Sequence, residues 1–229
     1  MIEVKNMSKS YLRRHVLKDV SFTAEKGQIT CLIGINGAGK STILKSIMGL
    51  SPIKKGQILV DGQPLDKLTY EKVAFIPDHL TMPLGMKLAE GLQFMADFYT
   101  NWEPSRAEEL MDFFQLDALE KIGNMSKGTA AKYNLVLGLA QKTEYVLMDE
   151  PFSGIDLFSR ELIAEVFSSH LIEDRGVLLT THEIGEIEQL IDKAVIMQKG
   201  TIVREFNCEE VRSAEGKSIV DVMREVYRS

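Results

Sequence analysis

Long hydrophobic runs are missing from this sequence of 229 residues. No apolar stretch approaches the roughly 20 residues that a helix needs to cross a bilayer. The opening stretch from Met1 to Lys5 also has no signal-peptide character. We therefore expect no transmembrane segment within the chain and, by default, a cytosolic location.

Cysteine is rare, since the chain holds only Cys31 and Cys208. Two residues this far apart form no metal-binding pattern, and a cytosolic compartment disfavours a disulfide between them. We expect Cys31 to fill the core beside a strand, and we assign Cys208 no role. Neither a cysteine-bound metal nor a disulfide framework is indicated.

An excess of basic residues is also lacking, because 27 lysines and arginines stand against 33 acidic residues, a formal net charge of −6. This balance argues against binding of nucleic acid through a broad basic face, although it leaves local basic patches possible. Hydrophobic residues make up 45% and charged residues 26% of the chain, as in soluble globular proteins. The length suffices to bury a full core, as one large domain or two small ones.

What the sequence does contain is a glycine-rich stretch that fits the phosphate-binding P-loop pattern, Gly34-Ile35-Asn36-Gly37-Ala38-Gly39-Lys40-Ser41-Thr42. An apolar run at 29–33 precedes it and a helix-like stretch at about 40–48 follows, which is the order of strand, loop and helix that the pattern requires. Glycines let backbone N–H groups approach phosphate oxygens, and a helix N-terminus favours an anion. The complete spacing disfavours the alternative, an ordinary glycine-rich turn.

On this interpretation Lys40 reaches the β- and γ-phosphates, Ser41 places its hydroxyl on Mg²⁺, and Thr42 adds a phosphate contact. An aromatic residue upstream of the loop, Tyr11, either stacks on a purine base or is a half-buried residue at a strand end. The predicted nucleotide-binding residues are Tyr11, Gly34, Ile35, Asn36, Gly37, Ala38, Gly39, Lys40, Ser41 and Thr42.

The middle of the chain changes from strand-like to helix-like composition. Strands are expected at 57–60 and 73–76, and between about 86 and 142 apolar residues recur at helical spacing, most clearly at 86–99 and 106–114. We interpret this region as a helical insertion between two strands of an α/β core. A stripe of methionine and phenylalanine is predicted to form the core of the insertion: Met86, Phe94, Met95, Phe98, Met111, Phe113 and Phe114.

Polar residues suited to ATP chemistry follow two later apolar strands. The strand at 145–148 leads into Asp149 and Glu150, and the strand at 177–180 leads to His182. Open α/β sheets bind ligands at such strand ends, so these side chains are expected to face the P-loop. Asp149 can then hold Mg²⁺, Glu150 can polarise the attacking water, and His182 can donate a hydrogen bond to the γ-phosphate. Taken alone, a strand-end carboxylate is usually just solvated and a single histidine is usually structural.

Periodicity and turn residues predict the remaining elements less sharply. The polar, basic stretch at 10–15 separates two short strands, and the tail beyond 207 is charged and weakly periodic, so we assign it no role. These remaining elements are strands at 2–7, 16–22, 194–197 and 201–206, and helices at about 158–171 and 184–191.

The order of these motifs resembles that of the ATP-binding subunits of ABC transporters, from Ile2 to Phe206. The matching motifs are the A-loop at Tyr11, Walker A at 34–42, the Q-loop near Asp78, the signature near Ser126, Walker B at 145–150, the D-loop at 153–156 with Asp156, and the switch histidine His182. In this family two such domains pack head to tail around two ATP molecules, each bound by the Walker motifs of one domain and the signature of the other. The resemblance therefore implies an α/β fold with a P-loop NTPase (RecA-like) core, a β-rich lobe and a helical subdomain, in a chain that works as a dimer.

The signature departs from the usual family sequence Leu-Ser-Gly-Gly-Gln, because residues 125–129 read Met-Ser-Lys-Gly-Thr. Ser126 and Gly128 remain, so the helix N-terminus can still face the partner's ATP, whereas Thr129 is too short to complete a capping box. A lysine in the first turn opposes the helix dipole unless an anion is near. Our hypothesis is that Lys127 meets the partner's γ-phosphate, which ATP-dependent dimerisation of Lys127→Ala tests. The alternative is that Lys127 points to solvent.

The Q-loop also departs from the family pattern, because Asp78 stands where glutamine is usual. Our hypothesis is that Asp78 joins Ser41 and Asp149 on Mg²⁺, which the Mg²⁺ dependence of Asp78→Gln tests. The Ser-Lys-Gly signature and the acidic Q-loop residue are similar to those of ABC-2-type exporter ATPases, which serve peptide, antibiotic or lipid export. The loop at 79–86 that follows is apolar for a surface turn, so it either receives a helix of the membrane subunit or packs on the helical lobe.

We therefore expect residues 1–229 to form one ABC ATP-binding domain, with a helical subdomain at about 86–142 and a short tail at 207–229. The chain is predicted to bind ATP and Mg²⁺ and to hydrolyse ATP to ADP and phosphate. It is expected at the cytoplasmic face of the cell membrane, with a second ABC ATPase subunit and an integral membrane permease as partners and no nucleic acid.

Two alternatives remain open. One is a soluble ABC ATPase that acts on ribosomes or nucleic acid; the chain has one such domain and no long coiled-coil or zinc insertion, which argues against that class. The other is a regulatory nucleotide binder with little turnover, against which the retained Glu150 and His182 count.

Overall fold

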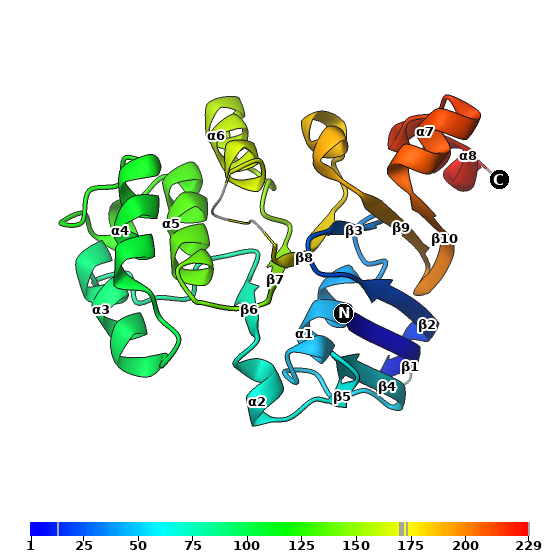
Figure 1. Cartoon of the computed structure of the whole chain (residues 1–229), viewed down its shortest axis with the longest axis horizontal. Coiled ribbons are helices and arrows are strands. Elements are labelled where there is room, and N and C mark those ends of the chain that lie inside the picture. The colour runs from blue at the N-terminus through cyan, green and yellow to red at the C-terminus, as the bar shows by residue number, and fades with distance from the viewer. Residues whose placement is uncertain (13, 170–171, 173, 229) are drawn as a thin grey trace.

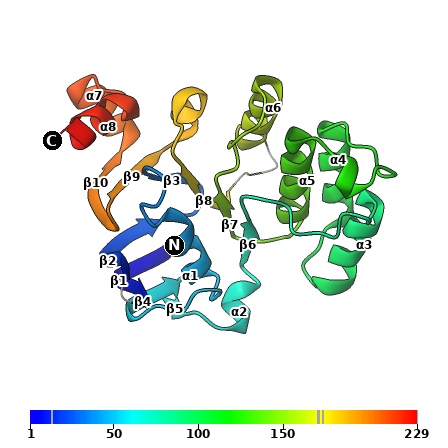
Figure 2. The same ribbon diagram turned by 180° about the vertical axis from the view of Figure 1, so that it is seen from behind.

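Two β-sheets organise the chain in the computed structural model, which describes residues 1–12, 14–169, 172 and 174–228 (Figure 1). One sheet has four strands in the order β2-β1-β4-β5, and the other has six in the order β10-β9-β3-β8-β7-β6. Helices α3, α4 and α5 gather at one end of the molecule and α7 and α8 at the other, as both views show (Figure 2). The predicted α/β class, with a β-rich lobe and a helical region, is confirmed.

The four-stranded sheet is antiparallel and packs its apolar face on α1 (Lys40–Ile47). Its strands are β1 (Ile2–Tyr11), β2 (Arg14–Ala24), β4 (Lys55–Val60) and β5 (Gln63–Pro64). The predicted polar linker at 10–15 is wrong, because Tyr11 pairs with Arg14 and Leu12 turns the chain with a φ of 52°. The backbones of β1 and β2 stay paired up to the end of the hairpin. This end faces solvent, so its strands do not need apolar side chains.

The six-stranded sheet forms the centre of the core. Its strands are β3 (Ile29–Ile33), β6 (Val73–Ile76), β7 (Tyr145–Asp149), β8 (Gly176–Thr181), β9 (Lys193–Gln198) and β10 (Thr201–Asn207). All pairs are parallel except β9 with β10, and the buried parallel strands are continuous apolar runs, as strands covered on both faces must be. The carboxyl ends of β3, β7 and β8 consequently meet at one edge, where open α/β sheets bind ligands.

The helical region between β6 and β7 consists of α3 (Leu88–Phe98), α4 (Pro104–Phe113) and α5 (Lys127–Leu139). Part of the predicted aromatic core is wrong, because the Phe94 and Phe98 side chains are 48% and 70% exposed and stack on each other at 6.0 Å. Helix α3 instead buries Leu88, Gly91 and Met95, which leaves the two phenylalanines on its other face. Met95, Met111 and Phe114 are buried as predicted, and Met86 and Phe113 are partly buried.

Two later helices also differ from expectation. Helix α6 (Leu157–Phe167) ends earlier than the predicted 158–171, whose last two residues lie outside the described part of the chain. The segment predicted as a helix at 184–191 is a 3₁₀ helix, η2 (Gly185–Leu190). It buries Ile184 and Ile187, three residues apart, and this spacing suits a 3₁₀ turn as well as an α-helix.

The tail beyond 207, to which the sequence assigned no element, forms two helices. Asn207 accepts hydrogen bonds from the N–H groups of Glu209 and Glu210 and so caps α7 (Cys208–Glu215), and α8 (Ile219–Arg228) follows.

Two short elements complete the fold: α2 (Lys67–Tyr70) and a 3₁₀ turn, η1 (Ile122–Asn124). Both cysteines are free and buried, and burial raises the pKa of Cys208 to about 12, so its thiol stays protonated. No helix in the described ranges combines the length and apolarity of a membrane span.

Candidate functional site

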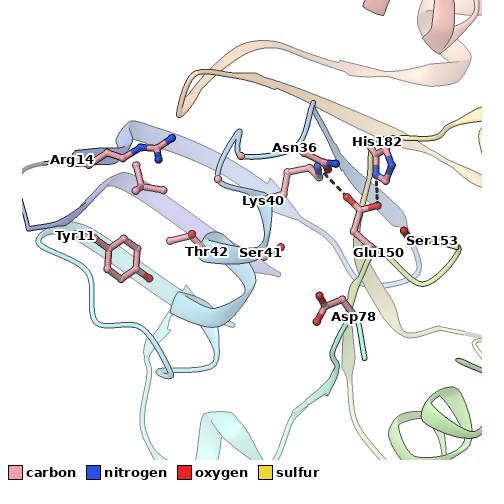
Figure 3. A pocket seen from close by; sticks show the side chains of 13 residues that line it. Tyr11, Arg14, Asn36, Lys40, Ser41, Thr42, Asp78, Glu150, Ser153 and His182 are labelled. Carbon is pink, nitrogen blue, oxygen red and sulfur yellow. Dashed lines mark hydrogen bonds and ion pairs between the residues drawn. The ribbon is translucent and has the colours of Figure 1, made fainter. Parts of the chain in front are cut away.

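A pocket of about 630 Å³ opens at the carboxyl edge of the six-stranded sheet (Figure 3). It collects residues from the β1–β2 hairpin, the P-loop, and the segments after β6, β7 and β8. Most predicted site residues therefore come together, although they are far apart in the sequence. The lining residues are Tyr11, Arg14, Val16, Asn36, Gly37, Gly39, Lys40, Ser41, Thr42, Asp78, Glu150, Ser153 and His182.

The P-loop wraps the start of α1 in the way that phosphate binding needs. Gly39 has a φ of 107°, and a Cβ there would lie 2.6 Å from the Leu17 side chain, so only glycine fits. Helix α1 starts at the next residue, Lys40, with no acidic residue in its first turn and no side-chain cap among the described residues. Its first N–H groups and the positive end of its dipole are therefore available to an anion.

A three-residue network crosses the pocket from the P-loop to the end of β8. Lys40, whose side chain is only 5% exposed, donates to the Gly34 carbonyl at 2.6 Å and pairs with Glu150, with 3.0 Å between Nζ and Oε1. The other oxygen of Glu150, Oε2, lies 2.8 Å from Nδ1 of His182. A phosphate at Lys40 would compete with this carboxylate, because both are anions seeking the same ammonium group.

Glu150 is held by its backbone as well as by its side chain. Its φ of 50° is the left-handed conformation that L-residues avoid, at a cost of about 1–3 kcal/mol, and such strain clusters at active sites. Its N–H group donates to the carbonyl oxygen of Thr180 at 3.1 Å and to the Thr180 hydroxyl at 3.0 Å. The neighbouring strand β8 thus fixes the direction in which this carboxylate projects.

Asp149 is buried and joins the pocket through Ser41, which lines it. Its Oδ1 accepts from the Ser41 hydroxyl at 2.9 Å and from the Thr180 hydroxyl at 2.7 Å. Its Oδ2 is buried and has no hydrogen-bond partner among the described residues, which is costly for a carboxylate oxygen. A hydroxyl beside an unsatisfied carboxylate is a hard-oxygen donor set that suits Mg²⁺, so these residues fit that ion.

Asp78 lies at the rim of the same pocket but is not joined to that pair. Its carboxylate is exposed and lies 2.7 Å from Nδ1 of His79, and in the described structure it has no hydrogen bond to Ser41 or Asp149. The described residues also hold no group of three or more histidine, cysteine, aspartate or glutamate side chains that could bind a metal. The role of Asp78 on Mg²⁺ stays a prediction.

The hairpin side of the pocket contains one predicted residue and two unpredicted ones. Tyr11 donates or accepts a hydrogen bond with Ser51 at 2.7 Å, lies under the Lys9 ammonium, and keeps half of its surface exposed. Arg14, labelled in Figure 3, and Val16 also line the pocket but were not singled out from the sequence. Only the register of the hairpin, which places Arg14 opposite Tyr11, could have indicated them.

The signature residues Ser126, Lys127 and Gly128 do not line this pocket. They start α5, where the Ser126 hydroxyl accepts from the Thr129 N–H at 3.1 Å, and Thr129 does not reach back to form a capping box. Lys127 is exposed beside a second hollow of about 320 Å³. This second hollow shares Asp78, Glu150 and Ser153 with the phosphate pocket and therefore adjoins it, whereas Ser126 and Gly128 line neither hollow.

The D-loop residue Asp156 belongs to the signature surface. Its carboxylate caps α6 by accepting from the N–H and hydroxyl of Ser159 at 2.9 and 2.8 Å, and these hydrogen bonds lower the pKa of Asp156. A Cβ on Gly128 would lie 2.5 Å from the Ser159 hydroxyl and 2.9 Å from the Asp156 carboxylate. The first turns of α5 and α6 therefore pack in direct contact.

Thr180 supports both acidic residues, and replacing it tests this arrangement. Thr180→Val should lower the free energy of unfolding by about 1–3 kcal/mol, because it removes a buried hydroxyl that bonds Asp149 and the Glu150 N–H. The matched control is Thr30→Val on the neighbouring strand β3, because the Thr30 hydroxyl is equally buried and has no partner among the described residues. In urea unfolding, the free energy of unfolding of the control should equal or exceed that of the wild type. An equal decrease in both variants would contradict the hydrogen bonds assigned to the Thr180 hydroxyl.

Comparison with known proteins agrees with this geometry. A family model described as ABC transporter matches residues 17–153. The linearmycin resistance ATP-binding protein LnrL of Bacillus subtilis is 33% identical, over 89% of this chain and 68% of its own. The manganese transport system ATP-binding protein MntB of Listeria innocua is 27% identical over 96% of this chain and 98% of its own. The lipopolysaccharide export system ATP-binding protein LptB of Escherichia coli is 28% identical over 93% of each chain.

A solved structure of an ATP-binding subunit of an ABC transporter is also similar. The two chains match over 99% of each, with a TM-score of 0.87 and 29% sequence identity. The protein therefore belongs to the ATP-binding proteins of the ABC transporter family.

Proposed function

We propose that this chain is the ATP-hydrolysing subunit of an ABC exporter and that two ATPase domains work together on a separate membrane subunit. The observation that carries the proposal is that the signature residues Ser126, Lys127 and Gly128 do not line the pocket at Lys40. A signature that cannot serve its own pocket suits a head-to-tail pair, in which each copy completes the site of the other. We include residues 1–229 in one ABC ATP-binding domain, with α3, α4 and α5 as its helical subdomain.

Nucleotide binding is assigned to the hairpin and the P-loop. The adenine base stacks on the exposed ring of Tyr11, while the N–H groups at 34–42 and the ammonium of Lys40 bind the phosphates. Ser41 and Asp149 would hold Mg²⁺, and Asp78 is a further proposed ligand. When bound, Mg²⁺ would neutralise charge on the β- and γ-phosphates.

Hydrolysis is assigned to Glu150 and His182. Binding of phosphate to Lys40 draws the ammonium group away from Glu150, which leaves Oε1 of that carboxylate able to accept a proton. The attacking water gives this proton to Glu150, its oxygen bonds to the γ-phosphorus, and the bond to the ADP oxygen breaks. His182 holds Oε2 of Glu150 and is close enough to the pocket to donate to the γ-phosphate.

The partner subunit's ATP is assigned to the signature surface. Ser126 and the N-terminus of α5 would face its phosphates, and the exposed Lys127 would add a positive charge. Asp156, at the start of α6, lies beside this surface and would take part in the same interface.

Export through a membrane permease is supported by the name of one relative, LptB, and by the motif variants. LptB is named for lipopolysaccharide export and LnrL for linearmycin resistance, whereas MntB is named only for manganese transport. We assign the cargo to the class of peptides, antibiotics or lipids and place the chain at the cytoplasmic face of the cell membrane. The loop at 79–86 is the proposed contact with the permease: its Leu80, Met82 and Met86 pack on the core, and its Leu84 is exposed.

Replacing Glu150 with glutamine tests the catalytic assignment. Glu150→Gln should reduce ATP turnover by about 100- to 10,000-fold, because an amide cannot accept the proton of the attacking water. ATP should bind at least as tightly, since the neutral side chain no longer competes with phosphate for Lys40. The matched control is Glu108→Gln, whose carboxylate is exposed on α4 and does not line the pocket, and its phosphate release rate should equal that of the wild type. Normal turnover in Glu150→Gln would refute Glu150 as the base.

Capture of a membrane subunit tests the transporter assignment. The tagged chain, extracted from membranes of its native cell in mild detergent, should co-purify with a multi-pass membrane protein. Leu84→Glu should lose that protein, because this leucine is 71% exposed in the proposed contact loop, whereas Leu50→Glu, 67% exposed after α1, should keep it. Recovery of ribosomes, nucleic acid or soluble partners alone would contradict the assignment.

A further inference from the structure

The C-terminal helix α8 packs along the six-stranded sheet beside the P-loop strand. One face of α8 is apolar at the spacing of a helix that is buried on one side, and this face packs on Ile196 of β9 and Val211 of α7. The residues of this face are Ile219, Val222, Met223, Val226 and Tyr227. The helix is thereby fixed in place, and its two ends contact η2 and the Met197 carbonyl at the end of β9.

The first end of α8 contacts the segment that follows His182. The Ile219 N–H donates to Oε1 of Glu188 at 2.6 Å, and Glu188 lies in η2. Ser218 and Asp221 cap the same end through mutual hydrogen bonds. This end of the helix is therefore tied to the strand-to-helix connection that begins at the switch histidine.

The other end of α8 contacts the start of the P-loop. The Tyr227 hydroxyl donates to the Met197 carbonyl at 2.8 Å. That carbonyl lies only 2.8 Å from where a Cβ of Gly34 would be, so it directly contacts the first P-loop residue. Burial raises the pKa of Tyr227, and a hydrogen bond with the backbone of Ile35 acts in the opposite direction.

A short series of contacts thus connects the tail with the phosphate-binding lysine. Tyr227 donates a hydrogen bond to the Met197 carbonyl, that carbonyl packs against Gly34, and the Gly34 carbonyl accepts a hydrogen bond from Lys40 at 2.6 Å. We propose that Tyr227 is a positioning residue that fixes the entry of the P-loop and so strengthens ATP binding. This inference rests on the proposed nucleotide site and adds the tail to it.

The physical reason is the freedom of the loop itself. The P-loop contains Gly37 and Gly39 with positive φ angles and leaves Ile35, directly after its first residue, exposed. A loop that is free at its entry loses conformational entropy when phosphates order it, and anchoring it beforehand reduces that cost. Such an anchor acts equally on bound ATP and on the transition state, so it should change KM rather than kcat.

Tyr227→Phe tests the proposal with minimal change in packing. KM and the dissociation constant for ATP should rise about two- to tenfold, the range that one ordinary hydrogen bond allows, while kcat stays near the wild-type value. The matched control is Tyr133→Phe, because the Tyr133 hydroxyl also donates to a backbone carbonyl, that of Leu88 at 2.7 Å, but in the helical subdomain. The control substitution should lower the melting temperature but leave KM and the dissociation constant for ATP unchanged.

The outcomes separate this inference from the proposed function. A wild-type chain that binds no ATP would refute the nucleotide site itself. A wild-type chain that binds ATP, together with Tyr227→Phe that binds it equally well, would refute the positioning role alone. An equal loss of affinity in Tyr133→Phe would also refute it, because the effect would then follow from general destabilisation.

Discussion

An ion pair between Lys40 and Glu150 joins the P-loop to the end of β7, with 3.0 Å between the charged atoms. Both side chains are largely buried, and a buried charge is costly unless it is paired, so neither group can be removed without leaving the other uncompensated. The pairing requires β3 and β7 to end at the same edge of the sheet with β8 between them. The register of the parallel sheet therefore determines whether the site exists at all.

The rest of the structure supports this contact from several directions. Thr180 of β8 orients both Asp149 and Glu150, His182 braces the free oxygen of Glu150, and Gly34 accepts a hydrogen bond from Lys40. At one end of the molecule α5 presents a surface that the pocket does not use, and at the other α8 holds the entry of the P-loop (Figure 1). The chain thus combines a hydrogen-bonded phosphate pocket with a signature at the start of α5, which our proposal assigns to a second copy.

The sequence alone predicted the parts whose signals are local. The P-loop, the buried strands and the residues at their ends follow from spacing and apolar runs, and these strands are confirmed. The exposed faces of Phe94 and Phe98 could not be predicted, because helical spacing does not say which face packs. Helix α8 was missed because its short apolar face alternates with charged residues, and Arg14 was missed because it depends on hairpin register. Pairing of Lys40 with Glu150 likewise requires the assembled sheet.

The most direct test of this account is the distance between Nζ of Lys40 and Oε1 of Glu150 in a crystal structure with a non-hydrolysable ATP analogue. The account predicts that the 3.0 Å contact is lost, with Lys40 on the phosphates and Glu150 still held by His182. An analogue bound elsewhere, or bound at the P-loop with the Lys40–Glu150 pair intact, would contradict it.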